Sequence, residues 1–106
     1  MRGWIGVDLD GTLAAYGGWR GPYDVGDPIP AMMERVKKWI AEGKEVRIFT
    51  SRAAMTKPEE LAPVRKWLQE QGIGDLVITN IKDFEMIELW DDRCVHVEVN
   101  TGRVLG

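Results

Sequence analysis

The positions of apolar residues follow two patterns along the chain: short continuous apolar runs, and longer segments with apolar residues three or four apart. A short run bounded by turn residues predicts a strand that is buried on both faces. A segment with the longer spacing predicts a helix with one apolar side. The runs predict four strands, at residues 4–10, 45–50, 75–79 and 87–91.

Two helices are predicted between the first three of these strands. The first covers residues 31–42 and is followed by a glycine, a typical residue after a helix C-terminus. The second ends at Gly72. A T-x-x-E capping box at residues 56–59 precedes it, but Pro63 disturbs the pattern, so the helix is expected to start near residue 62. Their apolar faces consist of Met32, Val36, Trp39 and Ile40 in the first and Leu61, Val64, Trp67 and Leu68 in the second.

Strands that alternate with helices predict an α/β domain, a three-layer Rossmann-like fold with a central, mostly parallel sheet and helices on both faces. The last alternating segments, CVHVEV and RVL, meet at residues 100–102 and predict a C-terminal β-hairpin. Residues 14–29 carry many glycines and prolines and predict a long loop. With 106 residues, the chain is expected to form a single domain, 1–106.

Composition and charge set few further limits. Hydrophobic residues make up 44% of the chain, enough for a core, and the net charge of -3 argues weakly against electrostatic binding to nucleic acid or an anionic membrane. Cys94 is the only cysteine, which excludes an intrachain disulfide; we expect a buried thiol and a cytoplasmic protein. No apolar run has the length of a membrane span and the first residues do not resemble a signal peptide, so no membrane partner is expected.

Polar residues suited to catalysis end three of the predicted strands. Asp8 and Asp10 close the first strand, Thr50 the second, and Asp91 and Asp92 the fourth. Ligand sites of parallel sheets lie beyond the carboxyl ends of the strands, so these residues are expected at one edge. Neighbouring carboxylates repel each other, and a divalent cation would offset that repulsion. Oxygen ligands suit Mg²⁺, whereas a chain with one histidine and one cysteine disfavours zinc.

Three simpler interpretations of the D-L-D-G stretch remain open. Asp10-Gly11 is a common hairpin turn pair, although the residues that follow do not form a good alternating strand. A calcium loop would need a later glycine, a third ligand and a distal glutamate. A solvated strand end would be the better interpretation of an isolated D-x-D pattern. The recurrence with Thr50 and a second acidic pair favours a catalytic site.

The ordered set of motifs resembles the haloacid-dehalogenase-like (HAD) superfamily, whose members are mostly Mg²⁺-dependent phosphohydrolases. Residues 8–12, D-L-D-G-T, are similar to its first signature, and Thr50 at the end of VRIFT is similar to its second. Lys82 would be the third and Asp91-Asp92 the fourth. The resemblance covers residues 4–97 and is strongest to small members without a cap domain, which share I-F-T-S-R and a terminal D-D-R.

The resemblance implies the catalytic and metal-binding roles. Asp8 would be the nucleophile that forms an aspartyl-phosphate, and Asp10 would be the general acid and then the general base. Asp8 and the backbone carbonyl of Asp10 would bind Mg²⁺. Asp91 would be a further ligand, with Asp92 bound directly or through water.

The resemblance implies substrate-binding roles for four other residues. Thr50 and Ser51 would bind the phosphoryl group, Arg52 a second anionic group, and Lys82 would balance the negative charge of the carboxylates and the intermediate. Each role has a simpler alternative, since Thr50 could cap a helix and the charged side chains could be solvated.

The function implied is a phosphatase that hydrolyses a phosphate monoester with Mg²⁺. Residues 14–29 are too few for a cap domain, so we expect an open site under a flap. Tyr16, Trp19, Arg20 and Tyr23 of this flap could stack on a nucleotide or a polynucleotide end, or pack the flap onto the domain. A phosphorylated small molecule or macromolecule could enter an open site, and a partner copy in a homo-oligomer could cover it. The alternative function is a phosphate-binding or phosphoryl-accepting regulatory module without turnover.

Overall fold

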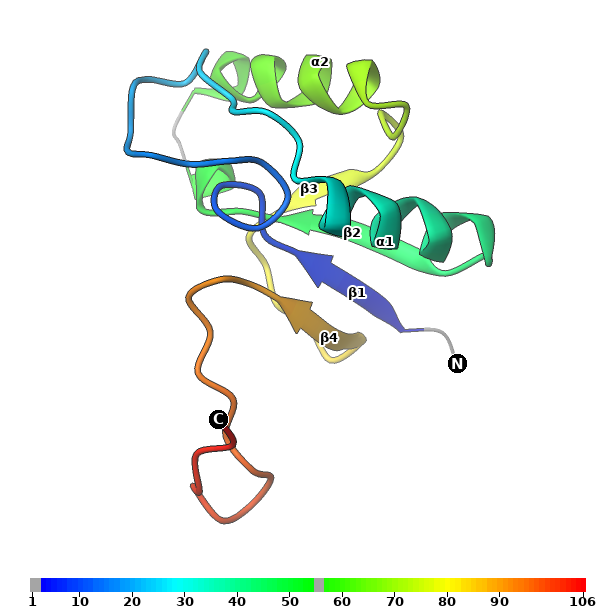
Figure 1. The fold of residues 1–106 in the computed structure, drawn as a ribbon, viewed down its shortest axis with the longest axis vertical. Coiled ribbons are helices and arrows are strands. Elements are labelled where there is room, and N and C mark those ends of the chain that lie inside the picture. The colour runs from blue at the N-terminus through cyan, green and yellow to red at the C-terminus, as the bar shows by residue number, and fades with distance from the viewer. Residues whose placement is uncertain (1–2, 55–56) are drawn as a thin grey trace.

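The computed structural model describes residues 3–54 and 57–106, which form a four-stranded parallel sheet with two α-helices (Figure 1). The strand order is β3-β2-β1-β4. The strands are β1 (Trp4–Val7), β2 (Glu45–Phe49), β3 (Val77–Thr79) and β4 (Met86–Trp90), and the helices are α1 (Pro30–Ala41) and α2 (Ala62–Glu70). Two 3-10 helices, η1 (Ser51–Ala54) and η2 (Pro58–Leu61), lie between β2 and α2. The predicted α/β class with a parallel sheet is confirmed.

The hydrophobic core lies between the sheet and the two α-helices. Ile5 and Val7 of β1 pair in register with Val46 and Ile48 of β2, so these four side chains point to the same face. They are buried in one cluster with the apolar sides of both helices. The buried helix residues are Met32, Met33 and Val36 in α1 and Val64, Trp67 and Leu68 in α2. Trp39 packs on this cluster while partly buried, and Ile40 is exposed.

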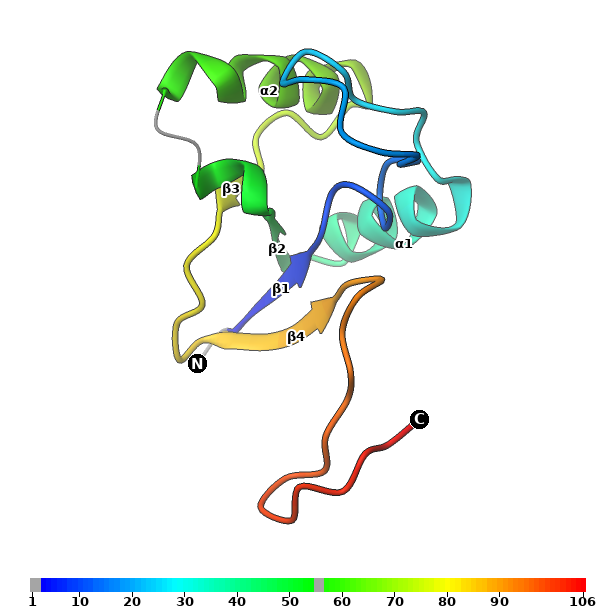
Figure 2. The same ribbon diagram turned by 90° about the vertical axis from the view of Figure 1, so that its left-hand side faces the viewer.

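Both α-helices therefore cover the same face of the sheet, which differs from the expected placement on both faces. Figure 2 shows α1 on one side of the sheet and the connection of residues 80–85 on the other. The chain advances from β1 to β2 to β3 in one direction, and right-handed crossovers place successive helices on the same face. The return to β4 on the far side of β1 is made by residues 80–85 alone, which are too few to include an α-helix.

An aromatic cluster covers the second face in place of a helix. Trp4 is 1% exposed and lies next to Phe49, with 6.3 Å between ring centroids. The guanidinium of Arg47 lies 4.6 Å from the centroid of the Trp4 ring. Trp4 Nε1 donates to Asp83 Oδ1 at 2.8 Å, which fastens the connection of residues 80–85 to this face.

Three further predictions concern the start of the second helix, the burial of Cys94 and membrane spans. The second helix starts at Ala62, as the prediction from Pro63 requires, while Thr56 of the expected capping box lies outside the described residues. The expected burial of Cys94 is wrong, because its thiol is exposed in the chain that leaves β4. Among the described residues, no helix combines the length and apolarity that crossing a membrane requires.

The C-terminal hairpin is present in reduced form. Residues 94–106, which we call the C-terminal arm, extend away from the sheet beyond β4 (Figure 1). A single antiparallel bridge joins Val97 and Val104, with backbone hydrogen bonds from Glu98 N to Arg103 O and from Leu105 N to His96 O. The turn has Asn100 at φ 67° and Gly102 at φ 80°, a left-handed geometry that these residue types tolerate.

Candidate active site

Three predicted carboxylates meet at the carboxyl edge of the sheet. One oxygen from each of Asp8, Asp91 and Asp92 lies within 4.8 Å of the others. Asp8 follows β1 and Asp91 follows the neighbouring strand β4, and the Asp8 backbone N–H donates to Trp90 O at 2.9 Å. The adjacency of these two parallel strands thus brings together residues that are more than 80 positions apart.

Thr12 and Gly11 hold this cluster in shape. Thr12 Oγ1 accepts a hydrogen bond from the Asp92 backbone N–H at 2.9 Å and lies 3.0 Å from Asp92 Oδ1, to which it can donate. Asp8 Oδ2, 3.5 Å from Thr12 Oγ1, is an alternative acceptor for the same hydroxyl proton. Gly11 has φ +95°, and a Cβ there would lie 2.6 Å from Asp92 Oδ2. The glycine and threonine of the D-L-D-G-T motif therefore position the second acidic pair.

The cluster perturbs the acidity of Asp8. Burial, together with the charges of Asp91 and Asp92, raises the pKa of the Asp8 carboxyl from 3.8 to about 7. A backbone hydrogen bond at Leu9 opposes the shift. Repulsion among these carboxylates is the condition under which a bound cation is most stabilising. Three closely spaced hard oxygen donors fit the ligand preference of Mg²⁺.

Asp10 is held apart from the three carboxylates by Arg52. Arg52 Nε and Nη2 donate to Asp10 Oδ2 and Oδ1, both at 2.8 Å, in a bidentate pair. The guanidinium also donates to Pro22 O at 3.1 Å and to Asp24 O at 2.7 Å. It lies 4.9 Å from the ring centroid of Trp19. Arg52 is only 3% exposed, so it ties the flap to Asp10, a role that the sequence did not indicate.

Thr50 and Ser51 lie beside this pair at the end of β2. Thr50 is 2% exposed, and its backbone N–H donates to Thr79 O at 2.9 Å. Its Oγ1 accepts from the Arg52 N–H at 3.1 Å, which caps η1. This contact uses the oxygen as an acceptor, so the hydroxyl proton can still be donated. Ser51 is exposed and lines the cavity over the carboxylates.

Lys82 is a predicted site residue whose side chain does not line the cavity. It is exposed on the connection of residues 80–85. Asn80, at the start of the connection, lines the cavity, whereas Asp83 is already fastened to Trp4 on the second face. Among the described residues, the cavity lining includes Asn80 and Arg93, for which no role was predicted, and includes neither Lys82 nor Thr50.

The cavity itself is open and has a volume of about 800 Å³. The four aspartates lie along it together with Tyr16 and Trp19 of the flap. The base of the flap is fixed by a bridge between Ala14 and Pro28 and by Trp67 Nε1, which donates to Gly26 O at 2.9 Å. Residues 15–20 at its tip are exposed. The base of the flap is therefore fixed to the domain, and its aromatic side chains line the same cavity as the carboxylates.

Comparison with known proteins identifies the fold alone. No protein-family model and no curated protein matches the chain. The structure is similar to that of the conserved protein coded by a locus of Bacteroides thetaiotaomicron, with a TM-score of 0.68 and 23% sequence identity. The similarity covers 90% of this chain and 79% of the other. At this identity it extends to the fold and gives no information on activity.

Proposed function

We propose that the protein is a Mg²⁺-dependent phosphatase that hydrolyses a phosphate monoester through an aspartyl-phosphate on Asp8. The observation that carries this proposal is the convergence of Asp8, Asp91 and Asp92 at the carboxyl edge of the sheet, with carboxylate oxygens within 4.8 Å of one another. The resemblance of D-L-D-G-T, Thr50 and the second acidic pair to the HAD superfamily supplies the reaction class. Both lines of support concern the same residues.

Asp8, Asp91 and Asp92 are the side chains that would hold Mg²⁺. When bound, the ion would neutralise negative charge on the phosphoryl oxygens and on the three carboxylates. Both carboxylate oxygens of Asp10 accept hydrogen bonds from Arg52, so the proton transfers proposed for Asp10 require that this pair opens and that Asp10 takes up a proton.

The reaction proposed has two displacements at phosphorus. In the first, a carboxylate oxygen of Asp8 bonds to phosphorus while the bond to the leaving oxygen breaks, and Asp10 gives that oxygen a proton. In the second, Asp10 takes a proton from a water molecule, whose oxygen bonds to phosphorus and releases Asp8. Protons and bonds balance over the cycle, because Asp10 recovers in the second step the proton that it gives in the first.

The other residues would bind the phosphoryl group and the rest of the substrate. Thr50 and Ser51, at the end of β2, would give hydroxyl protons to the phosphoryl group, and Ser51 lines the cavity. Lys82 would contribute positive charge if the connection of residues 80–85 turned it toward the cavity. Tyr16 and Trp19 favour a substrate with a flat group, such as a nucleotide or a polynucleotide end. The single cysteine is consistent with the cytoplasm as the place of action.

The test is release of inorganic phosphate from nucleotides, sugar phosphates and phosphorylated DNA ends, with Mg²⁺ and with EDTA. We expect turnover that needs Mg²⁺ and that falls at least about 1,000-fold in Asp8→Asn. The matched control is Asp75→Asn, the same change at an exposed aspartate outside the cavity, and it should retain full activity.

Two results would overturn the proposal. Sustained turnover by folded Asp8→Asn would remove the nucleophile from its role. Transfer of a single phosphoryl group per chain without further release would instead indicate the regulatory module, and mass spectrometry of the intact protein would detect it.

A further inference from the structure

The cavity over the carboxylates contains one cationic side chain that has no partner in the described part of the chain. Arg93 lines this cavity and is exposed. Its backbone N–H donates to Asp91 Oδ1 at 2.8 Å, whereas its guanidinium makes no hydrogen bond or ion pair among residues 3–54 and 57–106. The charge of Arg93 is therefore available to a ligand in the cavity.

The backbone of Arg93 is fixed beside the acidic cluster. The Asp91 carboxylate accepts the Arg93 N–H, and Thr12 Oγ1 accepts the Asp92 N–H at 2.9 Å. Both donors are backbone groups, so these two bonds do not depend on which side chain position 93 carries. Since Asp8 and Arg93 line the same cavity, a ligand bound there can contact both.

The other cations near the site are already engaged or lie outside the cavity. Arg52 is 3% exposed and donates four hydrogen bonds, two to Asp10 and two to carbonyls of the flap, which occupy most of its N–H groups. It cannot turn to a substrate without releasing Asp10 or the flap. Lys82 is absent from the described lining, and Arg20 of the flap lines a neighbouring hollow that includes none of the three clustered carboxylates.

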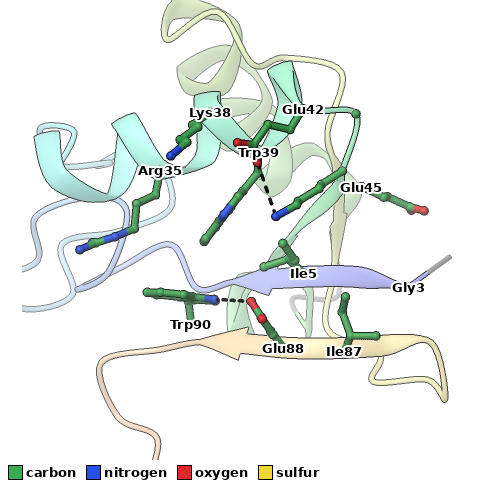
Figure 3. Close-up of a pocket in the computed structure, with 12 residues that line it drawn as sticks. Gly3, Ile5, Arg35, Lys38, Trp39, Glu42, Glu45, Ile87, Glu88 and Trp90 are labelled. Carbon is green, nitrogen blue, oxygen red and sulfur yellow. Dashed lines mark hydrogen bonds and ion pairs between the residues drawn. The ribbon is translucent and has the colours of Figure 1, made fainter.

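A groove between α1 and β4 (Figure 3) also carries basic side chains, but it does not form a site for an anion near the carboxylates. Lys44 pairs with Glu42 at 3.5 Å, and the guanidinium of Arg35 lies 5.5 Å from the centroid of the Trp90 ring. The described lining of this groove contains no aspartate, and its basic residues are matched by glutamates: Arg35, Lys38 and Lys44 against Glu42, Glu45 and Glu88.

We propose that Arg93 binds the phosphate group of the substrate and supplies the positive charge that the sequence resemblance assigns to Lys82. The planar guanidinium donates two parallel N–H groups, which fit two oxygens of one phosphate group. The inference rests on the proposed function, since it takes a phosphate group as the ligand of the cavity.

The charges of the cavity give the physical reason for such a cation. Four carboxylates and two guanidiniums line it, so one bound Mg²⁺ would leave it formally neutral. Without Arg93 the same site would be negative and would repel a phosphate monoester, which is itself largely dianionic at neutral pH. Arg93 therefore offsets a repulsion that the metal alone would not remove.

The first experiment measures binding of inorganic phosphate in Mg²⁺ by phosphorus NMR titration, which requires no turnover. Arg93→Gln removes the charge, keeps the backbone N–H to Asp91 and should weaken binding at least about 10-fold. Arg93→Lys keeps the charge without the fork and should recover part of this loss. The matched control is Arg103→Gln on the C-terminal arm outside the cavity, which should bind phosphate as the wild type does. Equal binding by Arg93→Gln and Arg103→Gln would overturn the inference, because Arg93 would then be a solvated side chain only.

A second experiment separates contact with phosphate from an effect on the carboxylates. In calorimetric titrations without phosphate, Arg93→Gln should bind Mg²⁺ as tightly as the wild type or more tightly, because a positive charge beside the carboxylates has been removed. Weaker Mg²⁺ binding would mean that Arg93 acts by supporting the carboxylates, and would overturn the inference. In steady-state kinetics KM should rise at least about 10-fold in Arg93→Gln, and more than in Lys82→Gln. The reverse order would return the role to Lys82.

This inference and the proposed function fail on different results. A protein that binds phosphate through Arg93 but hydrolyses no ester would lose the proposed function and keep the inference. Turnover that needs Asp8 and is indifferent to Arg93→Gln would do the opposite. A wild-type protein that binds no inorganic phosphate in Mg²⁺ would overturn the inference.

Discussion

Removing the charge of Asp8 is expected to stabilise the protein in the absence of divalent cations. Asp8→Asn keeps the size of the side chain and removes the group whose ionisation burial and the neighbouring carboxylates oppose. The raised pKa of about 7 against 3.8 corresponds to at most about 4 kcal/mol, at about 1.4 kcal/mol for each pH unit. Asp8 is only half buried, so solvent screening reduces the expected gain to about 1–2 kcal/mol.

The sign of the effect determines its pH dependence. Because the folded protein holds the Asp8 proton more tightly than the unfolded chain, stability falls as the pH rises from about 4 to about 7 and is then constant. The Asp8→Asn variant lacks this contribution. The two proteins should therefore be equally stable near pH 4, and the variant should be more stable by about 1–2 kcal/mol at pH 8.

The measurement is urea or thermal unfolding in EDTA between pH 4 and 8.5, with Asp75→Asn as the matched control. For a domain of this size the gain at pH 8 corresponds to a rise in Tm of about 5–15 °C. Mg²⁺ should reverse the order, because it would stabilise the wild-type protein by about 2.7 kcal/mol at a concentration of 100 times its Kd and the variant by less. A variant that is less stable than wild type in EDTA at pH 8, or a difference that does not vary with pH, would refute the reasoning.

Two further predictions concern the flap. Arg52→Lys keeps the charge but loses the bidentate pair with Asp10 and the contacts to the flap carbonyls, so stability should fall by about 2–4 kcal/mol and limited proteolysis should cleave the flap faster. Gly26→Ala should cost about 2–3 kcal/mol in urea unfolding, because a Cβ there would lie 2.0 Å from Ala15 O. Gly17→Ala, in open space on the same loop, is its control and should have almost no effect.

The positions of the strands and the parallel type of the sheet could largely be predicted from the sequence, because they depend on local patterns. The four apolar runs correspond to the four strands within a few residues, and the start of α2 near Pro63 follows from the geometry of proline. Parallel pairing then places the residues that follow β1, β2 and β4 at one edge. The contact of Asp8 with Asp91 and Asp92 also requires β1 and β4 to be neighbours, which strand type and strand ends alone do not give.

The features that the sequence did not indicate depend on contacts with no local pattern. Arg52 binds backbone carbonyls of Pro22 and Asp24, and carbonyls are present at every residue, so no residue type marks them as partners. The placement of both helices on one face depends on strand order, which periodicity does not contain. The position of the Lys82 side chain depends on the path of residues 80–85 between β3 and β4. That path is fixed in part by the hydrogen bond from Trp4 to Asp83, which lies 79 positions away in the sequence.

Thr12 connects the turn after β1 to the acidic pair after β4. Asp91 and Asp92 follow β4 directly, and the C-terminal arm begins at Cys94, so one short segment joins the carboxylates to the arm. Thr12 fixes this segment from the side of β1 through its bonds to Asp92. The acidic residues that follow β1 and β4 are therefore held together by one hydroxyl group, which keeps the carboxylates that would bind Mg²⁺ close to one another.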